Sequence, residues 1–145
     1  MIVVDAMRVV LDTNVIVAAM RSPAGASAEL LRRARSVRLA IVANVALALE
    51  YEAICAMPEH VSAAGLSRAE AGIFVDTVIA MCEPVETHFM WRPQLRDPAD
   101  EFVLEAAVNG QADAIVTFNG KDFIPAVRQF GIEIYSPQQA LRVMP

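Results

Sequence analysis

Few residues of the kinds that bind zinc or act as nucleophiles are present in this 145-residue chain. It has only two cysteines and two histidines. Cys55 and Cys82 stand far apart without the spacing of a zinc site, so we expect reduced, buried thiols. His60 and His88 form no H-x-x-x-H or H-E-x-x-H pair, which argues against a histidine-based metal site.

Long apolar runs are also missing, although 56% of the residues are hydrophobic and the mean hydropathy is +0.42. No run reaches the roughly 18 apolar residues that a membrane helix needs. The N-terminus lacks the charged start and long apolar core of a signal peptide. We therefore expect one cytoplasmic domain spanning residues 1–145, with no repeat or low-complexity tract.

Positive charge is scarce, and the formal net charge is −5. That balance by itself argues against a nucleic-acid binder. One segment departs from it, because five arginines stand near a single acid, Glu29: Arg21, Arg32, Arg33, Arg35 and Arg38. They could contact an RNA backbone, or they could form an ordinary solvated helix face.

Familiar catalytic motifs are lacking too, since there is no Ser-His-Asp set, phosphate-binding glycine loop or dinucleotide fingerprint. The chain has instead a short apolar run that ends on an acid. Val9, Val10 and Leu11 predict a strand buried on both faces, and Asp12 follows directly. Asn14 is expected to cap the next helix. Asp12 is a site candidate, with turn capping as its structural alternative.

Further apolar runs alternate with helical patterns, which predicts an open parallel sheet flanked by helices. The segment 60–65 is expected to be a short link between helices. Ser67 and Glu70 have the spacing of a capping box, and the helix that they open is expected to bury Ile73, Phe74, Val78 and Met81. The expected strands are 9–11, 39–42, 85–89, 114–117 and 132–135; the expected helices are 15–20, 27–35, 45–57, 67–81, 98–109, 123–130 and 137–141.

Two helices place an acid on an apolar face. At 100° per residue, Glu50 aligns with Leu47, Ile54 and Met57. A carboxylate in a buried stripe costs free energy unless it is paired or binds a metal. Glu50 is therefore a better site candidate than a solvated acid, although a rim pair with an arginine would also explain it.

Asp100 stands at the head of a buried face, because it aligns with Val103 and Ala107 on the next helix. Asp97 is well placed as the N-cap of that helix, with Pro98 in its first turn. Asp100 shares this capping explanation, but its inward direction favours a functional role.

These acids can converge if the first and fourth strands are neighbours, because the switch point of the sheet then lies between them. Carboxylates without histidine or cysteine suit Mg²⁺ or Mn²⁺. The acids that could converge there, and so the candidates for catalysis, are Asp12, Glu50, Asp100 and Asp122, with Asn119 beside them. Supporting residues that orient water or carboxylates are Thr13, Asn14, Thr117 and Asn119, with capping as their alternative.

Four segments in this order give the chain a family resemblance: Val10–Val15 (VLDTNV), Leu49–Glu52 (LEYE), Arg96–Ala107 (RDPADEFVLEAA) and Ile115–Phe123 (IVTFNGKDF). The chain resembles PIN-domain proteins of the group regarded as toxins of toxin–antitoxin systems (VapC-like). The resemblance implies a three-layer α/β/α sandwich with a parallel sheet of four to five strands. It also implies a metal-dependent ribonuclease, mostly endonucleolytic, using Mg²⁺ or Mn²⁺.

The resemblance carries residues and partners with it. The family's acidic positions match Asp12, Glu50 and Asp100, which the resemblance makes the expected metal ligands, with a fourth near Asn119 or Asp122. Many members have an aspartate at the place of Asn119, so the second metal depends on whether Asp122 compensates. The resemblance further implies a homodimer and a cognate antitoxin that occupies the acidic pocket.

Three other functions stay open. An aspartyl-phosphate phosphatase would use Asp12 as nucleophile, but Asn14 stands where its second aspartate is expected. A receiver domain would need an acidic pair beside Asp12, and Asp5 is too far upstream. A degenerate fold that binds protein or RNA without catalysis is consistent with Asn119.

Overall fold

The computed structural model describes residues 6–35, 39–86, 97–127 and 130–144. Its centre is a parallel sheet with the strand order β3-β2-β1-β4-β5. The strands are β1 (Met7–Leu11), β2 (Leu39–Ala43), β3 (Glu83–Pro84), β4 (Ala114–Val116) and β5 (Glu133–Tyr135). The predicted α/β class and five-stranded parallel sheet are confirmed.

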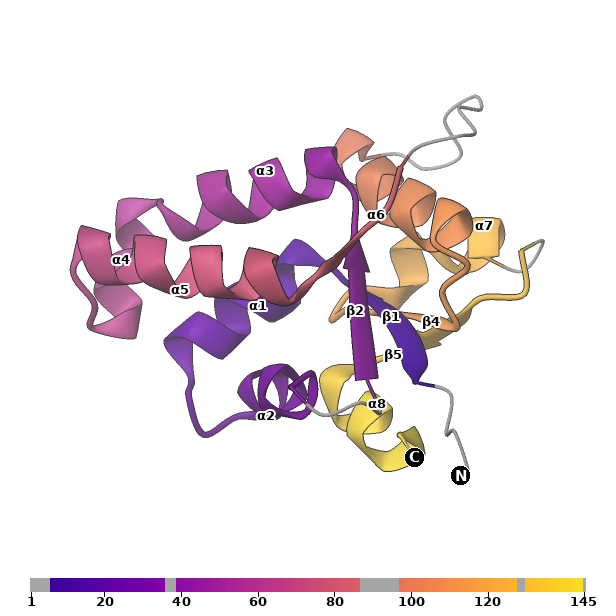
Figure 1. Cartoon of the computed structure of the whole chain (residues 1–145), viewed down its shortest axis with the longest axis horizontal. Helices are drawn as coiled ribbons and strands as arrows, with labels where there is room; N and C mark the ends of the chain where they lie inside the picture. The colour runs from indigo at the N-terminus through magenta and orange to yellow at the C-terminus, as the bar shows by residue number, and fades with distance from the viewer. Residues whose placement is uncertain (1–5, 36–38, 87–96, 128–129, 145) are drawn as a thin grey trace.

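Helices cover both faces of this sheet and give three layers (Figure 1). One layer contains α1 (Thr13–Arg21), α2 (Ala26–Arg33) and α8 (Pro137–Val143), and the other contains α6 (Pro98–Asn109) and α7 (Ile124–Val127). The helices α3 (Val45–Cys55), α4 (Pro58–Ala64) and α5 (Arg68–Met81) extend to one side of the sheet in Figure 1.

The central strand β1 shows why these residues form a parallel sheet. Val9, Val10 and Leu11 have no exposed surface, since helices lie on both faces. A continuous run of β-branched and aliphatic residues is typical of such a doubly covered strand. The strand stops at Asp12, whose backbone N–H still donates to the Val116 carbonyl at 2.9 Å. The polar residue thus begins where the sheet ends.

The chain reverses its direction across the sheet between β1 and β4. From β1 it proceeds to β2 and β3 on one side, and α6 then carries it back to β4 on the other side of β1. Open α/β sheets bind ligands at the carboxyl ends of strands at such a switch point. Asp12 and Thr117, which follow β1 and β4, lie at this place.

Several details differ from the sequence expectation. The expected link 60–65 belongs to helix α4, which Pro58 opens and Gly65 ends with a positive φ of 69°. Proline suits the first helical turn and glycine the left-handed residue after the last. In α5 the predicted capping box of Ser67 and Glu70 is confirmed. The burial predicted for Ile73 on the same helix is wrong, because this residue is 66% exposed.

The third strand lies earlier than predicted. It comprises Glu83–Pro84, and the N–H of Val85 adds one hydrogen bond to the Ala43 carbonyl at 3.0 Å. The rest of the predicted strand and His88 lie outside the described residues. The expected helix 123–130 is replaced by the 3₁₀ turn η1 (Gly120–Asp122) and the short α7, and residues 128–129 lie outside the description.

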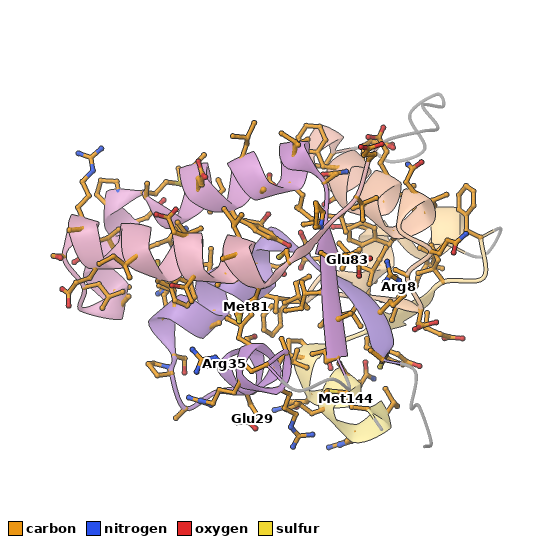
Figure 2. The ribbon with its side chains drawn as sticks, in the orientation of Figure 1. Arg8, Glu29, Arg35, Met81, Glu83 and Met144 are labelled. Atoms are coloured by element: carbon orange, nitrogen blue, oxygen red, sulfur yellow. The ribbon has the colours of Figure 1, made fainter. Side chains whose placement is uncertain are left out.

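Arg8 links three segments at the amino ends of the strands. Its guanidinium lies 2.7 Å from the Glu83 carboxylate (Figure 2). It also donates two hydrogen bonds to the Gly110 carbonyl, at 3.1 and 2.9 Å. A cation at the C-terminal end of α6 interacts favourably with the helix dipole. A side chain at Gly110 would approach the Ala106 carbonyl to 2.7 Å, so only glycine fits there.

Both cysteines are free thiols, Cys55 buried and Cys82 half-buried, and burial raises the pKa of each to about 11. Within the described residues, no helix is both long and apolar enough to cross a bilayer.

Candidate active site

Asp12 is the most constrained acid at the carboxyl edge of the sheet. Its side chain is 8% exposed. One carboxylate oxygen accepts the N–H of Thr13 at 2.8 Å, and the other accepts the hydroxyl of Thr117 at 2.7 Å. Burial raises the pKa of Asp12, and these two hydrogen bonds offset part of the rise.

Asp12 is also the N-cap of α1, in the place predicted for Asn14. The capping explanation and the site explanation therefore both apply to one carboxylate. Asn14 lies inside the first turn of α1, and its side-chain carbonyl oxygen is buried without a hydrogen-bond partner. Such an orphaned acceptor is unusual in a folded protein and is suited to receive a hydrogen from water or a bound group.

Thr13 joins Asp12 to Glu50. Its N–H binds the Asp12 carboxylate, and its hydroxyl donates to Glu50 at 2.6 Å. Burial raises the pKa of Glu50, and the charge of Asp12 adds to that rise. The helical periodicity that placed Glu50 on a buried stripe was partly wrong. Leu47 on that stripe is fully buried, but Met57 is 40% exposed and Glu50 itself is half-buried at the rim.

Asp100 approaches the site from the first turn of α6 and is half-buried. The inward face predicted for it is present, because Val103 and Ala107 are fully buried. Burial, reinforced by the charge of Asp12, raises the pKa of Asp100 to about 6. Asp97 caps the same helix by accepting the N–H of Ala99 at 2.9 Å.

The segment after β4 brings the remaining candidates. Thr117 is buried and donates to Asp12, and the backbone N–H of Asn119 donates back to the Thr117 hydroxyl at 3.0 Å. Asn119 and Asp122 are exposed, and Asp122 lies in η1. The charge of Asp122 contributes to the raised pKa values of Asp12 and Asp100, so it belongs to the same electrostatic cluster.

The cluster therefore carries uncompensated negative charge. Desolvation and mutual repulsion disfavour the ionised form of Asp12, Glu50 and Asp100, and a cation would reverse that effect. The residue types fit a hard cation, because their oxygens are the donors that Mg²⁺ prefers. Across the described part of the chain, however, no three acids, histidines or cysteines are gathered into a ready-made ion site.

The arginines lie elsewhere. Arg32 and Arg33 pair with Glu29 on α2, at 3.1 and 3.4 Å. Their helix leads toward the amino end of β2, whereas Asp12 follows the carboxyl end of β1. Arg21 ends α1, roughly 13 Å along that helix from Asp12. Arg38 lies outside the described residues, and RNA contact by this group stays a prediction.

Three residues at the site were not singled out by the sequence. Asp97 was assigned only as a cap, yet its charge contributes to the raised pKa of Asp12, Glu50 and Asp100. Tyr51 is fully buried, and its hydroxyl donates to the carbonyl of Leu11, directly before Asp12. Phe118, between Thr117 and Asn119, is 54% exposed. The sequence did offer a signal for Phe118, because it is the one apolar residue between the polar residues Thr117 and Asn119 that follow the strand.

Comparison with known proteins agrees with this architecture. The PIN domain family profile matches residues 8–121. Among solved structures, the fold is similar to the VapBC2 complex from Rickettsia felis bound to a DNA fragment from its promoter. The TM-score is 0.61 at 13% identity, over 90% of this chain and 98% of that one. A search of curated proteins gave no match. The family profile spans the strands and acids described above, and the chain belongs to the PIN-domain family.

Proposed function

We propose that the protein is a divalent-metal-dependent endoribonuclease and the toxin of a toxin–antitoxin pair. The observation that carries this proposal is the coupling of Asp12, Glu50 and Asp100 at the sheet switch point, each with a pKa raised by burial and by neighbouring acids. Acids held together at such a free-energy cost are typical of functional sites. Membership in the PIN-domain family supports a nuclease.

In this proposal Asp12, Glu50 and Asp100 hold Mg²⁺ or Mn²⁺, and Asp122 contributes to a second ion. The bound ion would activate water and stabilise the charge of the phosphodiester under attack. Thr13 and Thr117 fix the directions of the Asp12 and Glu50 oxygens through their hydrogen bonds. Asn14 presents its unpartnered carbonyl oxygen as an acceptor for water beside these acids.

An antitoxin that occupies the acidic pocket would also need a surface to pack against, and an apolar groove away from the acids offers one. It has a volume of about 600 Å³ between α1, α2 and α5, and its lining includes Met20, Phe74 and Met81. Arg35 stands at the groove, and Figure 2 shows it near Met81 where α2 faces α5. The similar solved structure is that of VapBC2 bound to a DNA fragment from its promoter. A homodimer is part of the same proposal, and sedimentation analysis tests it.

Cleavage of RNA tests the catalytic proposal. Structured and unstructured RNA is incubated with the protein and Mn²⁺, Mg²⁺ or EDTA. We expect cleavage with metal and none in EDTA, and a loss of roughly 100-fold or more in Asp12→Asn and Asp100→Asn. Asp76→Asn, which removes an exposed acid on α5, serves as the matched control and keeps full activity.

Cleavage that persists in EDTA, or in both site variants, would contradict the metal–carboxylate mechanism. The second candidate is a PIN fold that binds protein or RNA without catalysis. Two observations favour it, namely the exposed Asn119 in place of an acid and the lack of a preformed three-acid ion site among the described residues. RNA binding without cleavage under every metal condition would support this candidate instead.

A further inference from the structure

An exposed aromatic residue directly follows, in the chain, the residue that contacts Asp12. Thr117 is 2% exposed and contacts Asp12, whereas the next residue, Phe118, is 54% exposed. We propose that the ring of Phe118 stacks on a base of single-stranded RNA next to the cleaved phosphate, and that the groove it lines holds this nucleotide. The inference rests on the proposed function, because it names how the substrate of that site binds.

The backbone around Phe118 is held on both sides. The N–H of Thr117 donates to the Tyr135 carbonyl at 2.9 Å, and the N–H of Asn119 donates to the Thr117 hydroxyl at 3.0 Å. The same hydroxyl donates to Asp12 at 2.7 Å. Consecutive Cα atoms are 3.8 Å apart, so the ring is anchored one residue from the group that orients the catalytic acid. An exposed aromatic on a fixed backbone loses little entropy when a base stacks on it.

The groove beside Phe118 has the size and chemistry of a nucleobase site. Its volume is about 360 Å³, within the range of small-molecule pockets. Phe118 and Pro137 supply apolar surface, while Ser22, Ser27 and Gln138 supply hydroxyl and amide groups. None of the described residues that line it is charged. Such a lining suits the flat face and polar edge of a base better than it suits a phosphate.

The position of the groove separates it from the proposed antitoxin surface. It lies between the end of α1, the start of α2 and the start of α8, on the side of β4 and β5. The apolar groove with Met81 lies between α1, α2 and α5. Scattered exposed apolar residues are common on proteins, but Phe118 directly follows Thr117, whose hydroxyl donates to Asp12. RNA recognition commonly stacks unpaired bases on aromatic rings, and the interaction tolerates any base.

Substitutions at Phe118 test the inference. Binding of a single-stranded RNA is measured by fluorescence anisotropy in the Asp12→Asn background with EDTA, so that cleavage does not interfere. We expect Phe118→Ala and Phe118→Leu to weaken binding by roughly 5- to 100-fold, whereas Phe118→Trp keeps it. With Asp12 intact, Phe118→Ala raises KM and leaves kcat nearly unchanged. Val143→Ala, an exposed apolar residue at the other end of α8, is the matched control.

A spectroscopic measurement identifies the stacking itself. The double variant Phe118→Trp with Trp91→Phe has a single indole, at position 118. We expect RNA to quench its emission, because a stacked base deactivates the excited ring. Unfolding midpoints equal to the wild type verify that the exposed position does not affect folding.

The outcomes separate this inference from the proposed function. If the wild type cleaves RNA and neither Phe118→Ala nor Phe118→Leu weakens binding, the ribonuclease stands and the stacking site is wrong. If no RNA is cleaved but binding depends on an aromatic ring at position 118, the stacking site stands and the nuclease is wrong. If Phe118→Ala changes only the oligomeric state, the groove is a contact between copies of the chain and the inference is overturned.

Discussion

The two carboxylate oxygens of Asp12 have different partners. Asp12 caps α1 through the N–H of Thr13, and its other oxygen is held by Thr117. A cap usually needs one oxygen, so the second is free to be directed by a neighbour. The hydroxyl of Thr117 thus fixes the direction of the second oxygen, which capping alone does not require.

Replacement of Thr117 tests whether its hydrogen bond to Asp12 matters for activity. Thr117→Val keeps the shape of the side chain but removes the donor to Asp12 and the acceptor for Asn119. We expect the apparent affinity for Mn²⁺ or the cleavage rate to fall by roughly 10- to 100-fold, as for other groups that orient metal ligands. Titration with Mn²⁺ during RNA cleavage measures both the apparent affinity and the cleavage rate. Thr77→Val, which removes an exposed hydroxyl bound to its own helix, should change neither quantity.

The raised pKa of Asp100 predicts a pH-dependent stability. Between its ordinary value and about 6, the folded protein binds a proton that the unfolded chain has released, so this group lowers stability as the pH rises through that window. Asp100→Asn should therefore be more stable than the wild type at pH 7.5 in EDTA, and not at pH 3.5. Because Asp100 is only half-buried, solvent screening limits the gain to about 1 kcal/mol.

Urea unfolding of Asp100→Asn at the two pH values measures this difference, with Asp76→Asn as the control. A variant that is less stable than the wild type at pH 7.5 would mean that the carboxylate makes a favourable contact in the folded protein. The charge-repulsion account of the site would then be wrong.

At the scale of elements, the site depends on how α3 joins the end of β1. Glu50 and Tyr51 are consecutive residues of α3, yet they make different contacts. Glu50 accepts the Thr13 hydroxyl at the rim, and Tyr51 donates to the Leu11 carbonyl in the core. The pair sets the position of α3 relative to the strand end, and therefore the separation of Glu50 from Asp12.

Tyr51→Phe is expected to destabilise the protein by about 1–3 kcal/mol, because the buried Leu11 carbonyl loses its donor. The substitution leaves the ring and its packing in place. The free energy of unfolding in urea measures the effect, with the half-buried Tyr135→Phe as the control. A loss no larger than that of the control would show that the hydroxyl does not hold the strand end.

At the scale of the whole molecule, the net charge of −5 and the clustered acids predict that divalent cations stabilise the fold. A ligand at ten times its Kd stabilises the folded state by about 1.4 kcal/mol, which raises Tm by roughly 4 °C for a chain of this size. Mn²⁺ should produce this shift in the wild type. Asp12→Asn and Asp100→Asn should show a much smaller one in the same thermal scan.

An equal shift in the site variants would mean that the ion acts elsewhere or through general screening. Monovalent salt at matched ionic strength distinguishes screening from binding, because screening depends on ionic strength alone.

Local patterns in the sequence determined much of this protein. The uninterrupted apolar run before Asp12 fixed a doubly covered strand, and the spacing of Ser67 and Glu70 fixed a helix start, because both depend on neighbours along the chain. The inward direction of Asp100 followed from helical periodicity. The same reasoning misplaced Ile73, because periodicity gives a face of a helix but not which neighbours cover its edge.

Only the tertiary structure decided how the acids relate to one another. The sequence could not place Asp12 beside Thr117, since these residues meet through the pairing of β1 with β4 across more than a hundred positions. It assigned the cap of α1 to Asn14, whereas the strand end holds Asp12 in that place. It placed Glu50 in a buried stripe, whereas the side chain is half-buried, and it did not show that Tyr51 contacts the end of β1. Such contacts depend on packing between distant elements, which composition and periodicity do not encode.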